Sequence, residues 1–162
     1  MMSNYLYNRV FAPHEDSPKP FLIGETQTLS YATFHKQVNK LAHALITSGL
    51  KTGDRVAVQA AKSNTQLALY VATIKAGGVY LPLNTSYTAH ELDYFISNAQ
   101  ARLVVVDEKA HEAVAPIAEA QKAKLLTLNA DESGTLPALA EQQPARFEAI
   151  ARESEDLAAI LY

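Results

Sequence analysis

The chain has 162 residues, of which 48% are apolar and 19% are charged, so it is long enough for one domain with a hydrophobic core. Its 14 basic and 17 acidic side chains give a net charge of −3, which argues against disorder, a nucleic-acid surface and an anionic-membrane surface. The absence of cysteine excludes disulfides, thiolate metal sites and a cysteine nucleophile.

No sign of export or membrane insertion is found in the sequence. No apolar run approaches the roughly 18 residues of a membrane span. Residues 1–16 lack the basic segment and following apolar stretch of a secretory signal. We therefore expect a cytoplasmic protein that does not enter the membrane.

The N-terminal region is expected to be mostly irregular. Residues 1–20 carry three prolines and mixed charges, which favours an irregular lead-in. A short strand is expected at 21–23, a turn at 24–27 and a return strand at 28–29. The domain proper is therefore expected at 21–162.

Helices and strands alternate after this hairpin. Helices are expected to open after Ser30, after Ser63 or Asn64, after Thr88 and after Asp107, the last one running to Gln121 with a kink or break near Pro116. Strands are expected at 55–59, 79–81, 103–106 and 124–128, and a short helix at 136–141. This alternation predicts an α/β fold with a mostly parallel sheet and helices on both faces.

The last six residues, Leu157 to Tyr162, are apolar and predict a buried strand. Chains commonly end in a polar tail, so we expect this one to be truncated; the alternative is a natural terminal strand. An unpaired apolar edge is rarely left bare, which leads us to expect a homo-oligomer that uses this segment.

The sequence holds no complete motif for catalysis, nucleotide binding or metal binding. The six glycines form neither G-x-G-x-x-G nor a Walker loop, and the five histidines lack metalloprotease spacing. The acidic residues at element boundaries are read as caps and turns: Asp54, Glu91, Asp107 and Asp156. We assign no catalytic, cofactor-binding or metal-ligating residue.

Two loops are the best local candidates for a binding site. Residues Asn84–Tyr87 follow the strand at 79–81, and residues Gln59–Asn64 follow the preceding strand. Open parallel sheets bind ligands at the carboxyl ends of their strands, and Lys62 is placed there to meet an anion. The alternative for both segments is plain loop structure.

Two stretches resemble a known family. Residues Leu29–Phe34, LSYATF, resemble the first core motif of adenylate-forming enzymes, with Thr33 and Phe34 replacing the usual Glu-Leu. Residues Ile74–Asn84, IKAGGVYLPLN, resemble the second core motif over eleven consecutive positions. This superfamily contains acyl-CoA synthetases, luciferases and peptide-synthetase adenylation domains, and the resemblance runs from about Phe21 to Tyr162.

One branch is the most similar. The phrases PLNTSYT at 82–88, ELDYF at 91–95 and DLAAILY at 156–162 are similar to malonyl-CoA synthetases. The resemblance implies the N-terminal part of an acid–CoA ligase of fatty acid metabolism. With ATP and Mg²⁺ such a ligase converts a carboxylate, here malonate, to an acyl-adenylate that coenzyme A then captures.

The family's phosphate loop, adenine-binding segment and catalytic lysine all lie downstream of the matched motifs. The resemblance therefore implies a scaffold that is inactive alone. Two other functions stay open. One is a self-sufficient flavodoxin-like nucleotide or flavin binder, which needs a phosphate-binding loop after the strand at 55–59. The other is a non-catalytic interaction module, which needs a defined protein partner.

Overall fold

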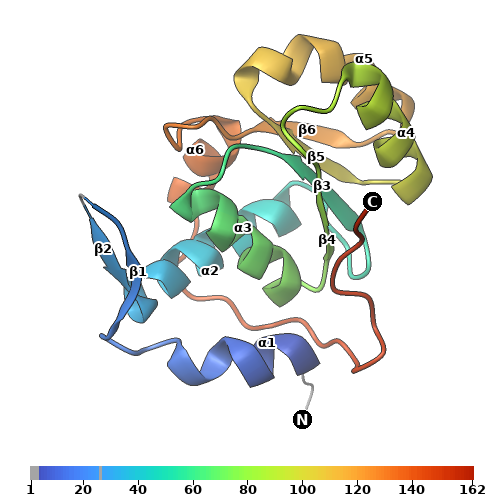
Figure 1. Cartoon of the computed structure of the whole chain (residues 1–162). Helices are drawn as coiled ribbons and strands as arrows, with labels where there is room; N and C mark the ends of the chain where they lie inside the picture. The colour runs from blue at the N-terminus through green and yellow to red at the C-terminus, as the bar shows by residue number, and fades with distance from the viewer. Residues whose placement is uncertain (1–3, 26) are drawn as a thin grey trace.

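The computed structural model describes residues 4–25 and 27–162; the start of the lead-in and Thr26 in the expected turn lie outside the described residues. Four strands form one parallel sheet in the order β4-β3-β5-β6 (Figure 1). They are β3 Arg55–Gln59, β4 Val79–Pro82, β5 Leu103–Val106 and β6 Lys124–Thr127. The chain thus builds β4 on one side of β3 and then continues on the other side.

Helices cover both faces of this sheet. On one face lie α2 (Tyr31–Thr47), α3 (Asn64–Lys75) and α6 (Thr135–Glu141), and on the other lie α4 (Ala89–Ala99) and α5 (His111–Ala120) (Figure 1). The predicted α/β class with helices on both faces is confirmed. The fold follows from apolar strands that are covered on both sides.

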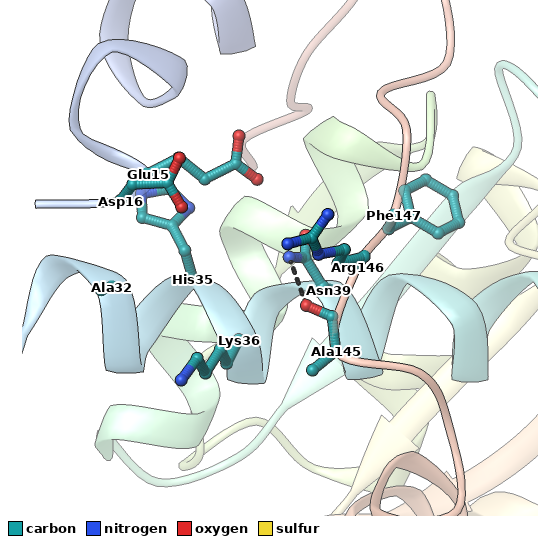
Figure 2. A pocket seen from close by; sticks show the side chains of 9 residues that line it. All are labelled: Glu15, Asp16, Ala32, His35, Lys36, Asn39, Ala145, Arg146 and Phe147. Carbon is teal, nitrogen blue, oxygen red and sulfur yellow. Dashed lines mark hydrogen bonds between the residues drawn. The ribbon is translucent and has the colours of Figure 1, made fainter.

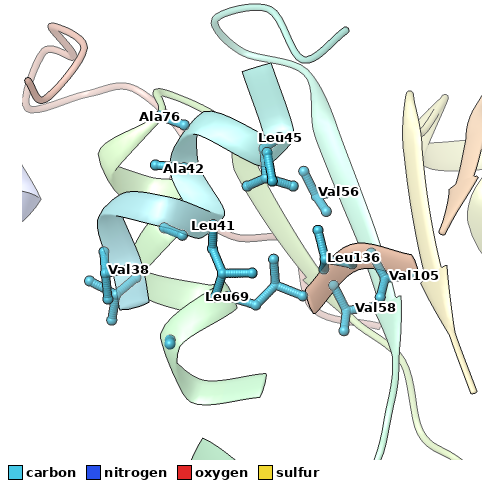
Figure 3. Packing of buried hydrophobic residues seen from close by; sticks show 14 of the residues in the cluster. Val38, Leu41, Ala42, Leu45, Val56, Val58, Leu69, Ala76, Val105 and Leu136 are labelled. Atoms are coloured by element: carbon cyan, nitrogen blue, oxygen red, sulfur yellow. The ribbon is translucent and has the colours of Figure 1, made fainter. Parts of the chain in front are cut away.

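Successive residues of β3 feed the two cores. Val56 and Val58 belong to the cluster under α2, α3 and α6, whereas Ala57 belongs to the cluster under α4 and α5. Figure 3 shows Leu41 and Leu45 of α2 and Leu69 of α3 gathered against the strand valines of the first cluster.

The predicted helix starts are confirmed by their caps. Ser30 accepts from the backbone N–H of Thr33, and Ser63 accepts from that of Gln66. Thr88 and Glu91 form a reciprocal capping box at the start of α4. These side chains satisfy amide groups that a helix start leaves without partners.

The lead-in is more regular than predicted. A short helix, α1 (Tyr5–Val10), and one 3₁₀ turn, η1 (Ala12–His14), precede the antiparallel hairpin of β1 (Pro20–Ile23) and β2 (Thr28–Ser30). Asn4 caps α1 by accepting from the N–H of Tyr7, whose side chain is buried. A six-residue helix is too short to produce a recognisable apolar period, so composition misled the prediction.

The predicted helix at 108–121 is divided at a different point. Asp107 caps a 3₁₀ turn, η2 (Glu108–Ala110), and α5 then begins at His111. Pro116 lies inside α5 rather than at a break. Hence the division comes from the tight turn after β5 and not from the proline.

The prediction of a buried strand at Leu157–Tyr162 is wrong. This segment makes a single parallel bridge, Ala159 with Tyr80 of β4. Leu161 is 77% exposed and Tyr162 48% exposed, while Ala158 and Ile160 pack against the two cores. An apolar run at a sheet edge is covered on its inner side only, which a continuous apolar sequence does not reveal.

Candidate functional site

The candidate site is the carboxyl edge of the sheet, formed by the loops that follow β3, β4, β5 and β6 (Figure 1). The order in which strands are added to the sheet reverses between β3 and β5, with β4 on one side and β6 on the other, and ligands of open α/β sheets bind outside the strand ends at such a reversal. Both predicted loops, Gln59–Asn64 and Asn84–Tyr87, lie on this edge because β3 and β4 are parallel neighbours.

Gln59 ties the two predicted loops together. Its side chain is 6% exposed. The amide Nε2 donates to the carbonyls of Asn84 at 2.9 Å and of Tyr87 at 3.1 Å. The Asn84 carboxamide in turn accepts from the N–H of Ser86 at 2.9 Å. These bonds fix the loop after β4, and they also occupy polar groups that a ligand would need.

The other loop is less engaged. Lys62 is exposed, and among the residues that the structure describes its side chain makes neither a hydrogen bond nor an ion pair. The prediction that it meets an anion stays a prediction.

The N-terminus of α3 is already bonded to a carboxylate of the protein itself. The carboxylate of Glu132, from the loop after β6, accepts from the backbone N–H of Thr65 at 3.0 Å and from its hydroxyl. Gln37 donates to the same Thr65 hydroxyl at 2.6 Å. A flavodoxin-like phosphate would occupy this helix start, so the carboxylate argues against that alternative.

A second hollow lies between the lead-in, α2 and the chain at 145–147 (Figure 2). It has a volume of about 350 Å³. Its lining is mainly polar: Glu15, Asp16, Ala32, His35, Lys36, Asn39, Ala145, Arg146 and Phe147. Figure 2 shows the Asn39 carboxamide reaching the Ala145 carbonyl, at 2.9 Å, which closes one side.

Beneath this hollow lies a buried polar cluster centred on Lys75, the lysine of the IKAGG motif. Lys75 is 1% exposed. Its ammonium donates to Glu15 and, at 2.6 Å, to Asn39, and it sits 4.7 Å from the centre of the Tyr7 ring. Sequence reasoning treated this lysine only as part of a motif, because no sequence pattern announces that Glu15 lies next to it.

Two residues beside this cluster, His35 and Tyr7, have shifted pKa values. Burial is the main cause that lowers the pKa of His35, and Lys75 lowers it further against the opposing effect of Glu15. Burial, followed by the nearby Glu15 carboxylate, raises the pKa of Tyr7 far above its ordinary value. These shifts favour the neutral form of His35 and the protonated form of Tyr7, whose hydroxyl lies 3.2 Å from Nδ1 of His35.

The other singled-out residues have structural partners. Nε2 of His43 bonds the Arg146 carbonyl at 2.8 Å, Asp54 accepts from the Lys51 N–H, and Asp156 pairs with Arg152 at 3.4 Å. Within residues 4–25 and 27–162, no three His, Asp or Glu side chains are grouped so that they could hold a metal ion.

Over the described part of the chain, none of the helices combines the length and the apolar character that crossing a membrane requires.

Comparison with known proteins identifies the family. The sequence model described as AMP-binding enzyme matches residues 11–162. Bacitracin synthase 3 of Bacillus licheniformis is 30% identical over 149 residues, which are 91% of this chain and 2% of that protein. Phenylacetyl-CoA ligase epaB of Aspergillus niger is 36% identical over 104 residues, 62% of this chain and 19% of that protein.

A solved structure is similar over almost the whole chain. ATP-bound MatB of Rhodopseudomonas palustris, a malonyl-CoA synthetase, superposes with a TM-score of 0.95 and 42% identity, covering 99% of this chain and 32% of MatB. The chain thus spans about a third of MatB and less of the other two relatives. It belongs to the AMP-binding enzyme family, and its fold is that of the N-terminal subdomain of adenylate-forming enzymes.

Proposed function

We propose that this chain is the N-terminal scaffold of an acid–CoA ligase that activates malonate. The likeness to MatB is the observation that carries the proposal, because it combines 42% identity with a TM-score of 0.95 over 99% of the chain. The anthranilate CoA ligase AuaEII is only 16% identical to this chain. Its similarity to this chain therefore concerns the fold alone.

The proposed whole enzyme works in two steps. A carboxylate oxygen of malonate attacks the α-phosphorus of ATP, and pyrophosphate leaves with its bonding electrons. The coenzyme A sulfur then attacks the acyl carbon, loses its proton and displaces AMP, which yields malonyl-CoA. In the family, Mg²⁺ and segments downstream of the matched motifs supply the positive charge that balances the phosphate oxygens.

Within that enzyme the chain supplies position rather than chemistry. At the carboxyl edge, Gln59 bonds the loop after β4 and Glu132 bonds the start of α3. These bonds hold the loops in place, and a substrate-binding part of the enzyme can pack on them. A cytoplasmic location and a homo-oligomer that uses Leu157–Tyr162 belong to the same proposal.

A fusion tests the scaffold proposal. Residues 1–162 are joined to the portion of R. palustris MatB that lies beyond the matched third, and malonate-dependent release of pyrophosphate and formation of malonyl-CoA are measured. We expect activity with malonate above that with benzoate. The matched control carries Phe147→Leu, a change away from the carboxyl edge, and keeps that activity.

A fusion that folds with the parent's thermal stability but makes no acyl-CoA from any acid contradicts the scaffold role. A fusion that prefers another acid leaves the ligase role intact and contradicts the malonate assignment.

A further inference from the structure

The terminal segment Leu157–Tyr162 is docked on the outer side of β4. The N–H of Tyr80 donates to the carbonyl of Ala158 at 2.9 Å, and the N–H of Ile160 donates to the carbonyl of Tyr80 at 3.0 Å. The bridge is parallel, so the segment runs in the same direction as β4. Tyr162 therefore arrives at the carboxyl edge, where the loop after β4 lies.

A row of aromatic rings receives the segment there. The Tyr162 ring lies 4.7 Å from that of Phe95, and the Phe95 ring lies 4.9 Å from that of Tyr87, centre to centre, each pair tilted by 39°. The Tyr162 hydroxyl donates to the Asn98 side chain at 2.5 Å. Three parts of the chain thus meet: the loop after β4, helix α4 and the terminal segment.

The row is anchored to the centre of the sheet. The carbonyl of Tyr87 is one of the two acceptors of the buried Gln59 amide. Gln59 is the last residue of β3, where it pairs with Val106 of β5. The connected path from Tyr162 to the reversal point of the sheet therefore consists of two ring contacts and one hydrogen bond. Such contacts restrict where a following segment can go without touching a substrate themselves.

We propose that Tyr87, Phe95 and Tyr162 are positioning residues that fix the point at which the rest of the ligase enters the carboxyl edge, with Gln59 holding them to β3. This inference rests on the proposed function. Reacting groups must be held within fractions of an ångström, and a shift of about 1 Å costs about 100-fold in rate. The family's phosphate loop lies downstream of the matched motifs. Loosening this row is therefore expected to lower kcat/KM for ATP while changing the thermal midpoint little.

The fusion with MatB tests the inference through Phe95→Leu. We expect kcat/KM for ATP to fall about tenfold or more, while the KM for malonate and the thermal midpoint stay within about twofold and about 3 °C of the parent's. Phe95→Tyr, which keeps a ring, restores the ATP parameter. Phe147→Leu, the same kind of change at a half-buried ring of the Figure 2 hollow, leaves it unchanged.

Equal effects of Phe95→Leu and Phe147→Leu on ATP use overturn the inference, and so does an equal fall in every kinetic parameter together with the thermal midpoint. Hydrogen exchange in the isolated chain supplies a second test that needs no activity. Phe95→Leu is expected to speed exchange of the Ile160 amide at least about tenfold, and Phe147→Leu is not. An unchanged Ile160 rate overturns the inference even if the parent fusion is inactive, whereas that inactivity alone counts against the proposed function.

Discussion

Single side chains decide how the lead-in is attached to the body of this protein. Among the described residues, the Glu15 carboxylate forms its ion pair with Lys75, whose ammonium also holds Asn39. Removing one partner of a buried pair leaves the other without compensation. We therefore expect the motif lysine to stabilise the fold.

Replacing Lys75 by Met tests this role. Because Glu15 keeps partial access to water, with 32% of its side chain exposed, we expect the free energy of unfolding to fall by about 2–3 kcal/mol, below the range for fully buried pairs. Lys40→Met, which breaks the surface pair with Glu141, is the matched control and costs less than about 1 kcal/mol. Similar urea-unfolding losses for the two variants argue against a central role for Lys75.

Gly78 is constrained by its neighbours. It follows Gly77, whose backbone has φ +74°. A Cβ on Gly78 would lie 3.0 Å from Cγ2 of Thr73 and 3.2 Å from Cδ2 of Leu50. We expect Gly78→Val to lower the free energy of unfolding by about 1–3 kcal/mol through overpacking.

The Thr73→Ser change removes the closest of these atoms. It should recover part of the stability lost by Gly78→Val in a double-mutant cycle measured by thermal unfolding. Strictly additive effects would show that Thr73 is not the obstacle.

We expect His35 to make stability depend on pH. Its pKa in the fold is lowered from 6.5, first by burial. As the pH falls through about 6.5, the unfolded chain takes up the proton before the folded chain does, so stability is lost until the folded pKa is passed. Urea midpoints at about pH 7.5 and pH 5 should therefore differ more for the wild type than for His35→Gln. Parallel shifts of the two proteins would assign the pH dependence to other groups.

At the level of elements, the loop after β6 is tied to the start of α3. Glu132 has φ +67°, an uncommon conformation for a non-glycine residue, and its carboxylate caps the helix through Thr65. The backbone is held in this conformation by a contact between segments 67 residues apart. The loop after β6 is thereby held against the start of α3.

Glu132→Gln removes the negative charge while keeping the size of the side chain. We expect a loss of about 0.5–2 kcal/mol in the free energy of unfolding, from the cap and from the helix dipole. Glu141→Gln is the surface control and should cost less than about 1 kcal/mol. Thermal unfolding of both variants decides the matter, and a Glu132→Gln protein as stable as the wild type would contradict the capping role.

Elements with strong local signals were predictable. Ser30, Ser63 and Thr88 mark helix starts, and the apolar run Leu103–Val106 marks a central strand. The short helix α1 and the exposed state of Leu157–Tyr162 were not predictable, because each depends on a contact with a distant segment. Asn4 bonds the carbonyls of Ile74 and Ile150, and Ala158 bonds Tyr80.

The candidate site shows the same division. The positions of the two loops at the carboxyl edge follow from the parallel alternation of strands and helices. Their engagement by Gln59 and the carboxylate of Glu132 at α3 do not, since side-chain partners 25 to 67 residues apart leave no periodic signal. Sequence motifs indicated the family, and only the structure showed which side chains the loops are hydrogen-bonded to.

At the scale of the whole molecule, we propose that this chain is a scaffold without chemistry of its own. The direct measurement is malonate-dependent exchange between ATP and pyrophosphate by the purified 162-residue chain, next to its fusion with the remaining part of MatB. We predict exchange at the level of a buffer blank for the chain alone and clear exchange for the fusion. Exchange by the chain alone, in a preparation free of any full-length ligase, would contradict the account.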